Sequence, residues 1–212
     1  MRHWLPQAEG PPVHVTRRNE ADALEFLRSR PAGRPFCLTL AFVAAHAEDQ
    51  HPQQFLPQPE SLGLYAGVRI PVPPTATEAH HRRLPPFIAN ERNEGRVRWH
   101  WRFDEPEKYQ EMMRNYYRLV TEADAVCGRV LAELERQGVL EETLVVWGGE
   151  FGRTPMQENR EGKTQDYFGR DHHTDAFTMW LAGGGVKGGQ IIGSTDPVGY
   201  AAIDQPVHPN DL

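Results

Sequence analysis

The feature that most constrains the fold is a long apolar stripe of helical period over residues 105–137. Asp104 can cap this segment, Pro106 suits a first helical turn, and Gly138 stands where a helix end favours glycine. After a short loop the chain enters the apolar run 143–147, which is rich in strand-forming residues. The pattern therefore predicts a long amphipathic helix that leads into a buried strand.

Two more apolar runs, 35–43 and 177–181, have the length and turn boundaries of buried strands. A shorter helix is expected after Asn19, which can serve as its N-cap. Because strands that alternate with helices favour parallel pairing, we expect an α/β fold with a largely parallel sheet flanked by helices. Chemistry in such sheets collects beyond the carboxyl ends of the strands, here at His46 and around Glu150.

Length and composition exclude several classes of protein. The chain has 212 residues, enough for one domain or a small pair, and its net charge of −6 argues against a nucleic-acid partner. It has no apolar run long enough to span a membrane, and its start carries no secretion signal. The two cysteines, Cys37 and Cys127, are too few for a disulfide framework and are expected in the core as inert thiols.

Residues 47–104 contain prolines too densely for regular helix or strand, and their aromatic side chains can hold an ordered excursion in place. Residues 1–15 are expected to form an irregular lead-in.

Residues 16–146 resemble the middle of a sulfatase, a branch of the alkaline phosphatase superfamily. The run 35–43 followed by Ala44, Ala45 and His46 is similar to the sulfatase segment PFFLYLSFVAPHxP. The end of the predicted long helix and the strand after it are similar to the approach GxLDNTLVVFTSDNG to the sulfatase metal site.

Residues 147–212 resemble the DUF1501 family instead. The segments on which this resemblance rests are VVWGGEFGRTP, GRDHH, FTMWLAGGGVKGG and the closing PVHPNDL. Together the two resemblances imply a single, partial domain over residues 1–212 with an incomplete alkaline-phosphatase-like fold. Both ends are expected to be truncated, since the first strand's paired aspartates are absent and the chain stops at Asp211 and Leu212.

The resemblance implies a divalent metal held by Glu150, which falls on the sulfatase aspartate of the S-D-N-G motif, together with His173 or its neighbour His172. Phe151 replaces the asparagine of that motif and cannot be a ligand. An oxygen-only site in sulfatases suits calcium, whereas a carboxylate with imidazoles suits zinc, manganese or iron. Two adjacent histidines on a strand cannot both face one metal, so one of them is expected to support the other.

His46 falls on the sulfatase histidine that contacts the anion of the substrate, which makes it the candidate catalytic and substrate-binding residue. Arg153 is the second candidate for contact with the anion. The alternatives are that His46 is a hydrogen-bonded structural histidine and that Arg153 is the ion-pair partner of Glu150.

The resemblance implies a metal-dependent hydrolase of small sulfuric or phosphoric esters. We expect this chain to be inactive alone, because neither cysteine stands in the C-x-P-S-R motif that supplies the sulfatase nucleophile. The alternative is a non-catalytic remnant or a metal- or anion-binding module, so the sequence leaves open whether the chain is an enzyme. Sulfatases of this type are often periplasmic or secreted, but nothing in this chain indicates a compartment.

Overall fold

The computed structural model describes residues 2–162, 169–208 and 210, which form two compact units. The first unit comprises residues 1–71 and 102–140, and the second comprises residues 72–101 and 141–212. Each unit is described by itself below. The single domain expected from the sequence stays a prediction.

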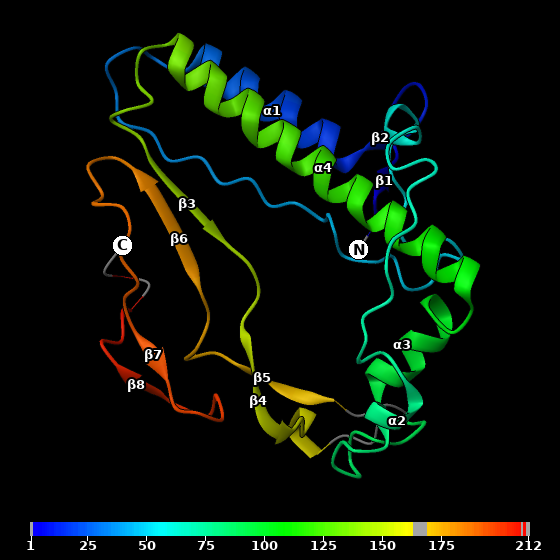
Figure 1. Cartoon of the computed structure of the whole chain (residues 1–212). Coiled ribbons are helices and arrows are strands. Elements are labelled where there is room, and N and C mark those ends of the chain that lie inside the picture. The colour runs from blue at the N-terminus through cyan, green and yellow to red at the C-terminus, as the bar shows by residue number, and fades with distance from the viewer. Residues whose placement is uncertain (1, 163–168, 209, 211–212) are drawn as a thin grey trace. The chain divides into compact units, whose positions relative to one another are not determined.

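The first unit is built on two helices, α1 (Val15–Ser29) and α4 (Pro106–Arg136), which lie side by side (Figure 1). Their buried contact consists of small and branched apolar side chains at helical spacing: Ala23, Leu27, Val126, Val130 and Leu134. The long helix predicted from the sequence is confirmed. Gly138, just beyond the helix end, has a φ of 70°, a conformation that glycine adopts without strain.

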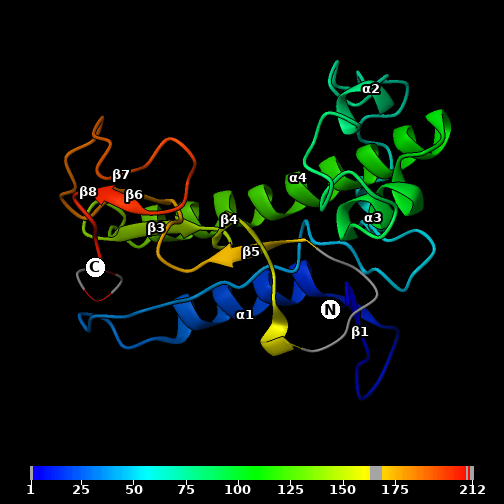
Figure 2. The same cartoon turned by 90° about the horizontal axis from the view of Figure 1, so that it is seen from below.

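The extended segment 35–43 follows α1 (Figure 2) and is fastened to it where Asn19 Nδ2 donates to the carbonyl of Ala41 at 2.9 Å. Its side chains alternate, as in a strand. The inward set packs against the helix pair: Phe36, Leu38, Leu40 and Phe42. Cys37 on the other side is exposed, so the expectation that this thiol lies in the core is wrong. Only one face of the segment is covered.

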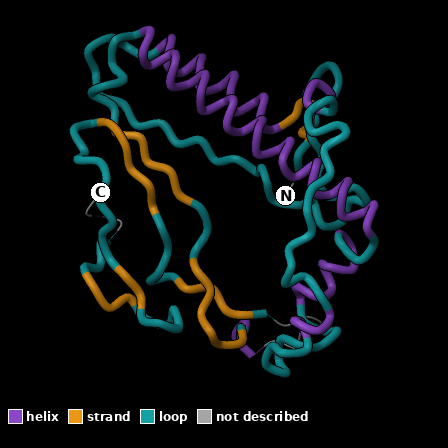
Figure 3. Tube along the Cα trace, viewed as in Figure 1, coloured by secondary structure: helices purple, strands orange, loops and turns teal. Residues whose placement is uncertain are grey.

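No partner strand pairs with segment 35–43 among the described residues, and the segment is drawn as loop in Figure 3. Asn19 is likewise not the N-cap of α1. The helix begins at Val15, with His14 as its cap, so both the cap and the start lie five residues earlier than expected. The expected strand at 35–43 and the expected Asn19 cap were wrong for the same reason. The local sequence pattern shows whether a segment is apolar or polar, but it does not show which groups accept or donate the hydrogen bonds of its backbone.

A short hairpin, β1 (Trp4–Leu5) and β2 (Val13–His14), precedes α1, where the sequence indicated an irregular lead-in. The loop after segment 35–43 returns to α4 through the helical turn η1 (Pro59–Ser61). A second apolar cluster lies here and consists of Ala47, Phe55, Met112 and Leu119.

The second unit contains the helices α2 (Glu78–His81) and α3 (Glu94–Arg102), of which Arg102 belongs to the first unit. Its strands are β3 (Leu144–Gly148), β4 (Gly152–Gln157), β5 (Arg170–His173), β6 (Met179–Gly183), β7 (Ser194–Thr195) and β8 (Ala202–Asp204). A helical turn, η2 (Arg160–Gly162), follows β4.

Every ladder between described strands is antiparallel and two-stranded: β1 with β2, β3 with β6, β4 with β5, and β7 with β8. The mixture of helix and strand agrees with the sequence, but the largely parallel sheet does not appear among the described strands. The expectation that β3 is buried is also wrong, because four of its five residues are exposed in a ladder of only two strands. The connection from β3 to β6 runs through the β4–β5 ladder, without the crossover helix that two parallel neighbours require. Within the described ranges no helix is long and apolar enough to cross a membrane.

The C-terminal ends of α1 and α4 are joined by a buried carboxylate, Glu133, whose side chain is 4 % exposed. Arg136 Nη2 donates to it at 2.5 Å, Gln137 Nε2 at 2.9 Å, and Arg28 Nη2 at 3.3 Å from α1. The hydrogen bonds from Arg136, and next those from Gln137, lower the pKa of Glu133 to about 2. Because this pKa lies below the ordinary value of 4.5, the stabilisation is complete above pH 4.5 and is lost as the pH falls toward 2.

We therefore expect Glu133→Gln to lower the melting temperature by a few degrees at pH 7 and by progressively less between pH 4.5 and 2.5, measured by circular dichroism. The control is Asp22→Asn, which removes the exposed ion pair with Arg18 and should change the melting temperature little at any pH. An offset between Glu133→Gln and the unsubstituted chain that is the same at pH 7 and pH 2.5 would contradict this role.

Candidate functional site

The candidate residues of the second unit gather on the β4–β5 ladder. Arg153 is paired with His172, and Gly152 with His173. Directly paired residues project from the same face of an antiparallel ladder, and successive residues from opposite faces. Arg153 and His172 therefore share one face, where both are exposed, while His173 lies on the other face and is buried.

His173 uses both of its ring nitrogens in hydrogen bonds to the protein. Its Nδ1 accepts from the backbone N–H of Asp175 at 3.3 Å, which leaves Nε2 to donate to the carbonyl of Tyr200 at 2.8 Å. A metal ligand needs one ring nitrogen with a free lone pair. In this conformation His173 joins the turn that follows β5 to the segment before β8, and it offers no free lone pair.

Glu150 lies in the short turn between β3 and β4 and is exposed. No hydrogen bond or ion pair connects it to Arg153 in the described part of the chain. Arg153 Nη1 donates instead to the carbonyl of Arg170 at 2.9 Å, which holds the guanidinium along the ladder. The interpretation of Arg153 as the ion-pair partner of Glu150 is therefore not supported by the geometry.

These residues do not fit a metal site in the arrangement that the structure gives them. Across residues 2–162, 169–208 and 210, no three His, Cys, Asp or Glu side chains converge in a group that could hold a metal ion. Asp171, which directly precedes His172, accepts a hydrogen bond from the backbone N–H of His172 at 2.9 Å and makes no hydrogen bond to either imidazole among the described residues. The donors nearest to one another in sequence thus face different directions.

His46 belongs to the first unit, in the loop that follows segment 35–43, and its ring is exposed. Its Nδ1 lies 2.6 Å from the carbonyl of Ala47, a contact in which only a protonated nitrogen can donate. When the ring is neutral, its Nε2 therefore carries the lone pair, and when it is charged, Nε2 carries a proton. Either form gives His46 one polar atom with which to contact a ligand.

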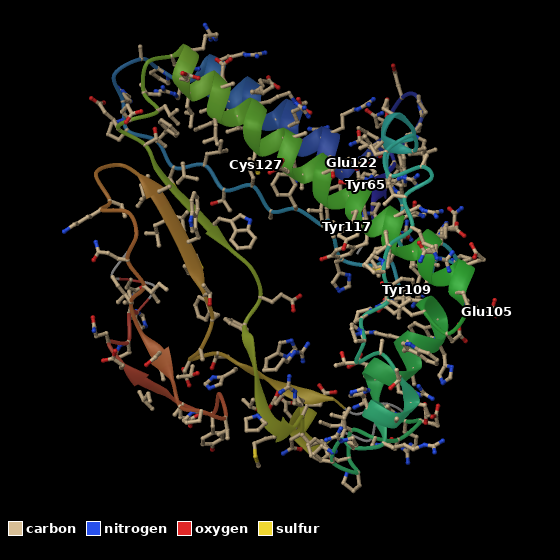
Figure 4. All side chains as sticks on the ribbon, viewed as in Figure 1. Tyr65, Glu105, Tyr109, Tyr117, Glu122 and Cys127 are labelled. Atoms are coloured by element: carbon tan, nitrogen blue, oxygen red, sulfur yellow. The ribbon has the colours of Figure 1, made fainter. Side chains whose placement is uncertain are left out.

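A cluster of buried ionisable side chains was not predicted from the sequence. His3 and His14 are buried with their rings stacked, and Glu122 of α4, labelled in Figure 4, lies next to them. His14 could have been found as a cap, because it directly precedes the apolar spacing of α1. His3 has no such signal, since its burial depends on the hairpin and on loop residues distant in the sequence.

The two cysteines differ in their surroundings. Cys127, labelled on α4 in Figure 4, is partly buried, and burial raises the pKa of its thiol. It is therefore less nucleophilic at neutral pH than an ordinary cysteine. This agrees with the expectation of an inert thiol for Cys127.

Comparison with solved structures gives one faint likeness. A structure described as BT4656 in complex with its substrate, D-glucosamine-2-N,6-O-disulfate, is similar with a TM-score of 0.44 and 20% identity. The likeness covers 64% of this chain, and the chain spans 37% of that protein. No curated protein matches the chain significantly.

The family comparison is stronger. Residues 90–212 match the family described as "Protein of unknown function (DUF1501)". The match begins well before residue 147, so it also takes in α4 and most of the segment between α2 and α4, which the sequence resemblance had assigned to a sulfatase-like part. Because the match covers more than half of its residues, the chain belongs to the DUF1501 family.

Proposed function

We propose that the chain binds the anionic group of a small sulfate or phosphate ester through Arg153, with His172 beside it. The observation that carries the proposal is the cross-strand pairing of these two residues on the exposed face of the β4–β5 ladder. The resemblance of the surrounding motifs to enzymes of hard oxyanions supports the choice of ligand class.

Arg153 is suited to this role by its fixed position. Its bond to the carbonyl of Arg170 uses one N–H and restrains the planar guanidinium, while the remaining N–H groups make no hydrogen bond within the described residues. A guanidinium can present two parallel donors to the oxygens of a sulfate or phosphate group. A protonated His172 at the paired position would add a second positive charge on the same face.

Binding of inorganic sulfate and phosphate, measured by isothermal titration calorimetry at low salt, tests the proposal. We expect Arg153→Gln to weaken binding at least tenfold, since it removes the charge-assisted hydrogen bonds. The matched control is Lys187→Gln, which removes one exposed positive charge from the same unit and should change the affinity less than twofold. Equal losses in both variants would show non-specific attraction and would overturn the assignment to Arg153.

We further propose that Glu150 with a histidine binds a divalent metal only weakly, because the described residues do not converge in a group that could hold it tightly. One carboxylate and one imidazole are fewer ligands than a tight metal site requires. We expect zinc binding in calorimetry to be weak and to be lost in Glu150→Ala, with Glu141→Ala as the exposed control. Sub-micromolar zinc binding that survives Glu150→Ala would place the metal elsewhere.

A second candidate function, hydrolysis of the ester, is favoured by one observation. The contact between His46 Nδ1 and Ala47 orients the ring and leaves Nε2 for a ligand, as a proton-transferring histidine requires. A nucleophile is still needed, and neither Cys37 nor Cys127 stands in the motif that provides it in sulfatases.

We accordingly expect the purified chain to hydrolyse aryl sulfates and aryl phosphates no faster than background when calcium, zinc or manganese is added. His46→Ala should be indistinguishable from the unsubstituted chain in this assay. Metal-dependent turnover that His46→Ala abolishes would replace the binding proposal with the hydrolase.

A further inference from the structure

The feature that carries a further inference is His14, the last residue of β2 and the N-cap of α1. Its ring is 1 % exposed. The backbone N–H of Thr16, at 3.3 Å, can only donate, so Nδ1 accepts and carries no proton. Nε2 then carries the proton and donates to the carbonyl of Leu56 at 3.0 Å. The structure thus shows a neutral imidazole that caps a helix.

The second element is Glu122 on α4 (Figure 4), a carboxylate with only one oxygen in use. Its Oε1 accepts from the backbone N–H of Gln58 at 2.7 Å and from the hydroxyl of Ser61. Its Oε2 is buried without a hydrogen-bond partner and lies 4.0 Å from His14 Nδ1. An open acceptor position therefore stands beside the ring nitrogen that caps the helix.

The third element is His3, which is fully buried against His14, with ring centroids 5.8 Å apart and ring planes 14° apart. Neither of its ring nitrogens makes a hydrogen bond. Its backbone N–H donates to Glu48 Oε2 at 3.1 Å, and its carbonyl accepts from Val15 at the start of α1. His3 thereby connects the His14 cap to the loop that also contains His46.

Charged groups face His14 from each neighbouring element. Burial is the largest influence and lowers the pKa of His14. Glu122 from α4 and Glu60 from η1 act to raise it, and Arg17 from α1 acts to lower it. Burial likewise lowers the pKa of His3, followed by the proximity of His14, while the His46 backbone, Glu48 and Glu122 act in the opposite direction. Both rings are therefore held neutral at physiological pH.

We propose that His14 is a proton-operated cap of α1. In its neutral form the ring accepts the N–H of Thr16 and completes the first turn of the helix. When Nδ1 takes a proton from solvent, it can no longer accept, so the hydrogen bond to Thr16 breaks and the new N–H donates to Glu122 Oε2. Acidification thus exchanges a helix cap for an ion pair with α4 and loosens the start of α1 together with the hairpin before it.

The stability of the capped start of α1 depends on pH in a direction set by the burial of His14, which lowers the pKa of its ring. Because the pKa of His14 in the folded chain lies below its ordinary value of 6.5, the capped state is fully stable above pH 6.5 and loses stability as the pH falls below that value.

Nuclear magnetic resonance of the full chain tests the proposal in two measurements. The ring nitrogen shifts of His14 should show an unprotonated Nδ1 at pH 7.5 and a protonation midpoint below pH 6.5. Hydrogen exchange of the Thr16 amide, corrected for its intrinsic pH dependence, should lose about fivefold to tenfold of its protection through the same transition, as expected for loss of a cap. A proton on Nδ1 at pH 7.5, or protection of Thr16 that does not change as His14 titrates, would overturn the proposal without any variant.

Two variants separate the cap from the ion pair. His14→Asn keeps a capping acceptor that does not titrate, so the protection of Thr16 should become independent of pH between 7.5 and 5. Glu122→Gln removes the negative charge that accepts the new hydrogen bond from His14 Nδ1, so the protonation midpoint of His14 should fall further. The matched control is Glu60→Gln, an exposed carboxylate near the same ring, which should shift the midpoint less. An equal shift in the two glutamine variants, or an unchanged pH dependence in His14→Asn, would contradict the proposed exchange.

Discussion

The first unit depends on the packing of α1 against α4. These helices are separated in sequence by the whole proline-rich excursion, yet they share one apolar contact, closed at its end by Glu133 with partners from both helices. Burying a carboxylate costs free energy unless its lone pairs accept hydrogen bonds. Glu133 therefore stabilises only the alignment of α1 and α4 in which Arg28 and Arg136 reach its oxygens. The apolar contact supplies the attraction, and the ionic network selects the alignment. Segment 35–43 then packs its inward side chains against the apolar contact of the helix pair.

Burial divides the histidines of this chain into different chemical roles. His14 and His173 are buried and use both ring nitrogens, one as donor and the other as acceptor, which makes each a neutral connector between backbone segments. His46 and His172 are exposed, so each can contact a ligand. Adjacent positions on a strand are enough to produce this division, as His172 and His173 show, because successive side chains leave opposite faces of the ladder.

The same alternation gives the proposed anion site its geometry. Arg153 and His172 come from segments separated by η2 and are brought together only by the register of β4 on β5. A shift of that register by one residue would turn Arg153 toward the face of His173 and separate the two charges. The register is therefore the structural requirement for the binding proposal, and the exposed guanidinium provides its chemistry.

The sequence by itself determined the elements whose signal is local. The apolar period and the flanking Pro106 and Gly138 define α4, because the burial of one helical face is recorded in neighbouring residues. The apolar run at 143–147, which contains Val145 and Val146, defines β3 as a strand, although four of the five residues of β3 are exposed. The concentration of polar residues around Glu150 and His173 was also visible in the sequence.

Only the tertiary structure decided the direction of strand pairing, the absence of a described partner for segment 35–43, and the replacement of Asn19 by His14 as the helix cap. These outcomes depend on contacts between residues far apart in the chain: Asn19 is drawn to the carbonyl of Ala41, and His14 is buried beside His3 and Glu122, so that its ring, and not a better capping residue, meets the first turn of α1.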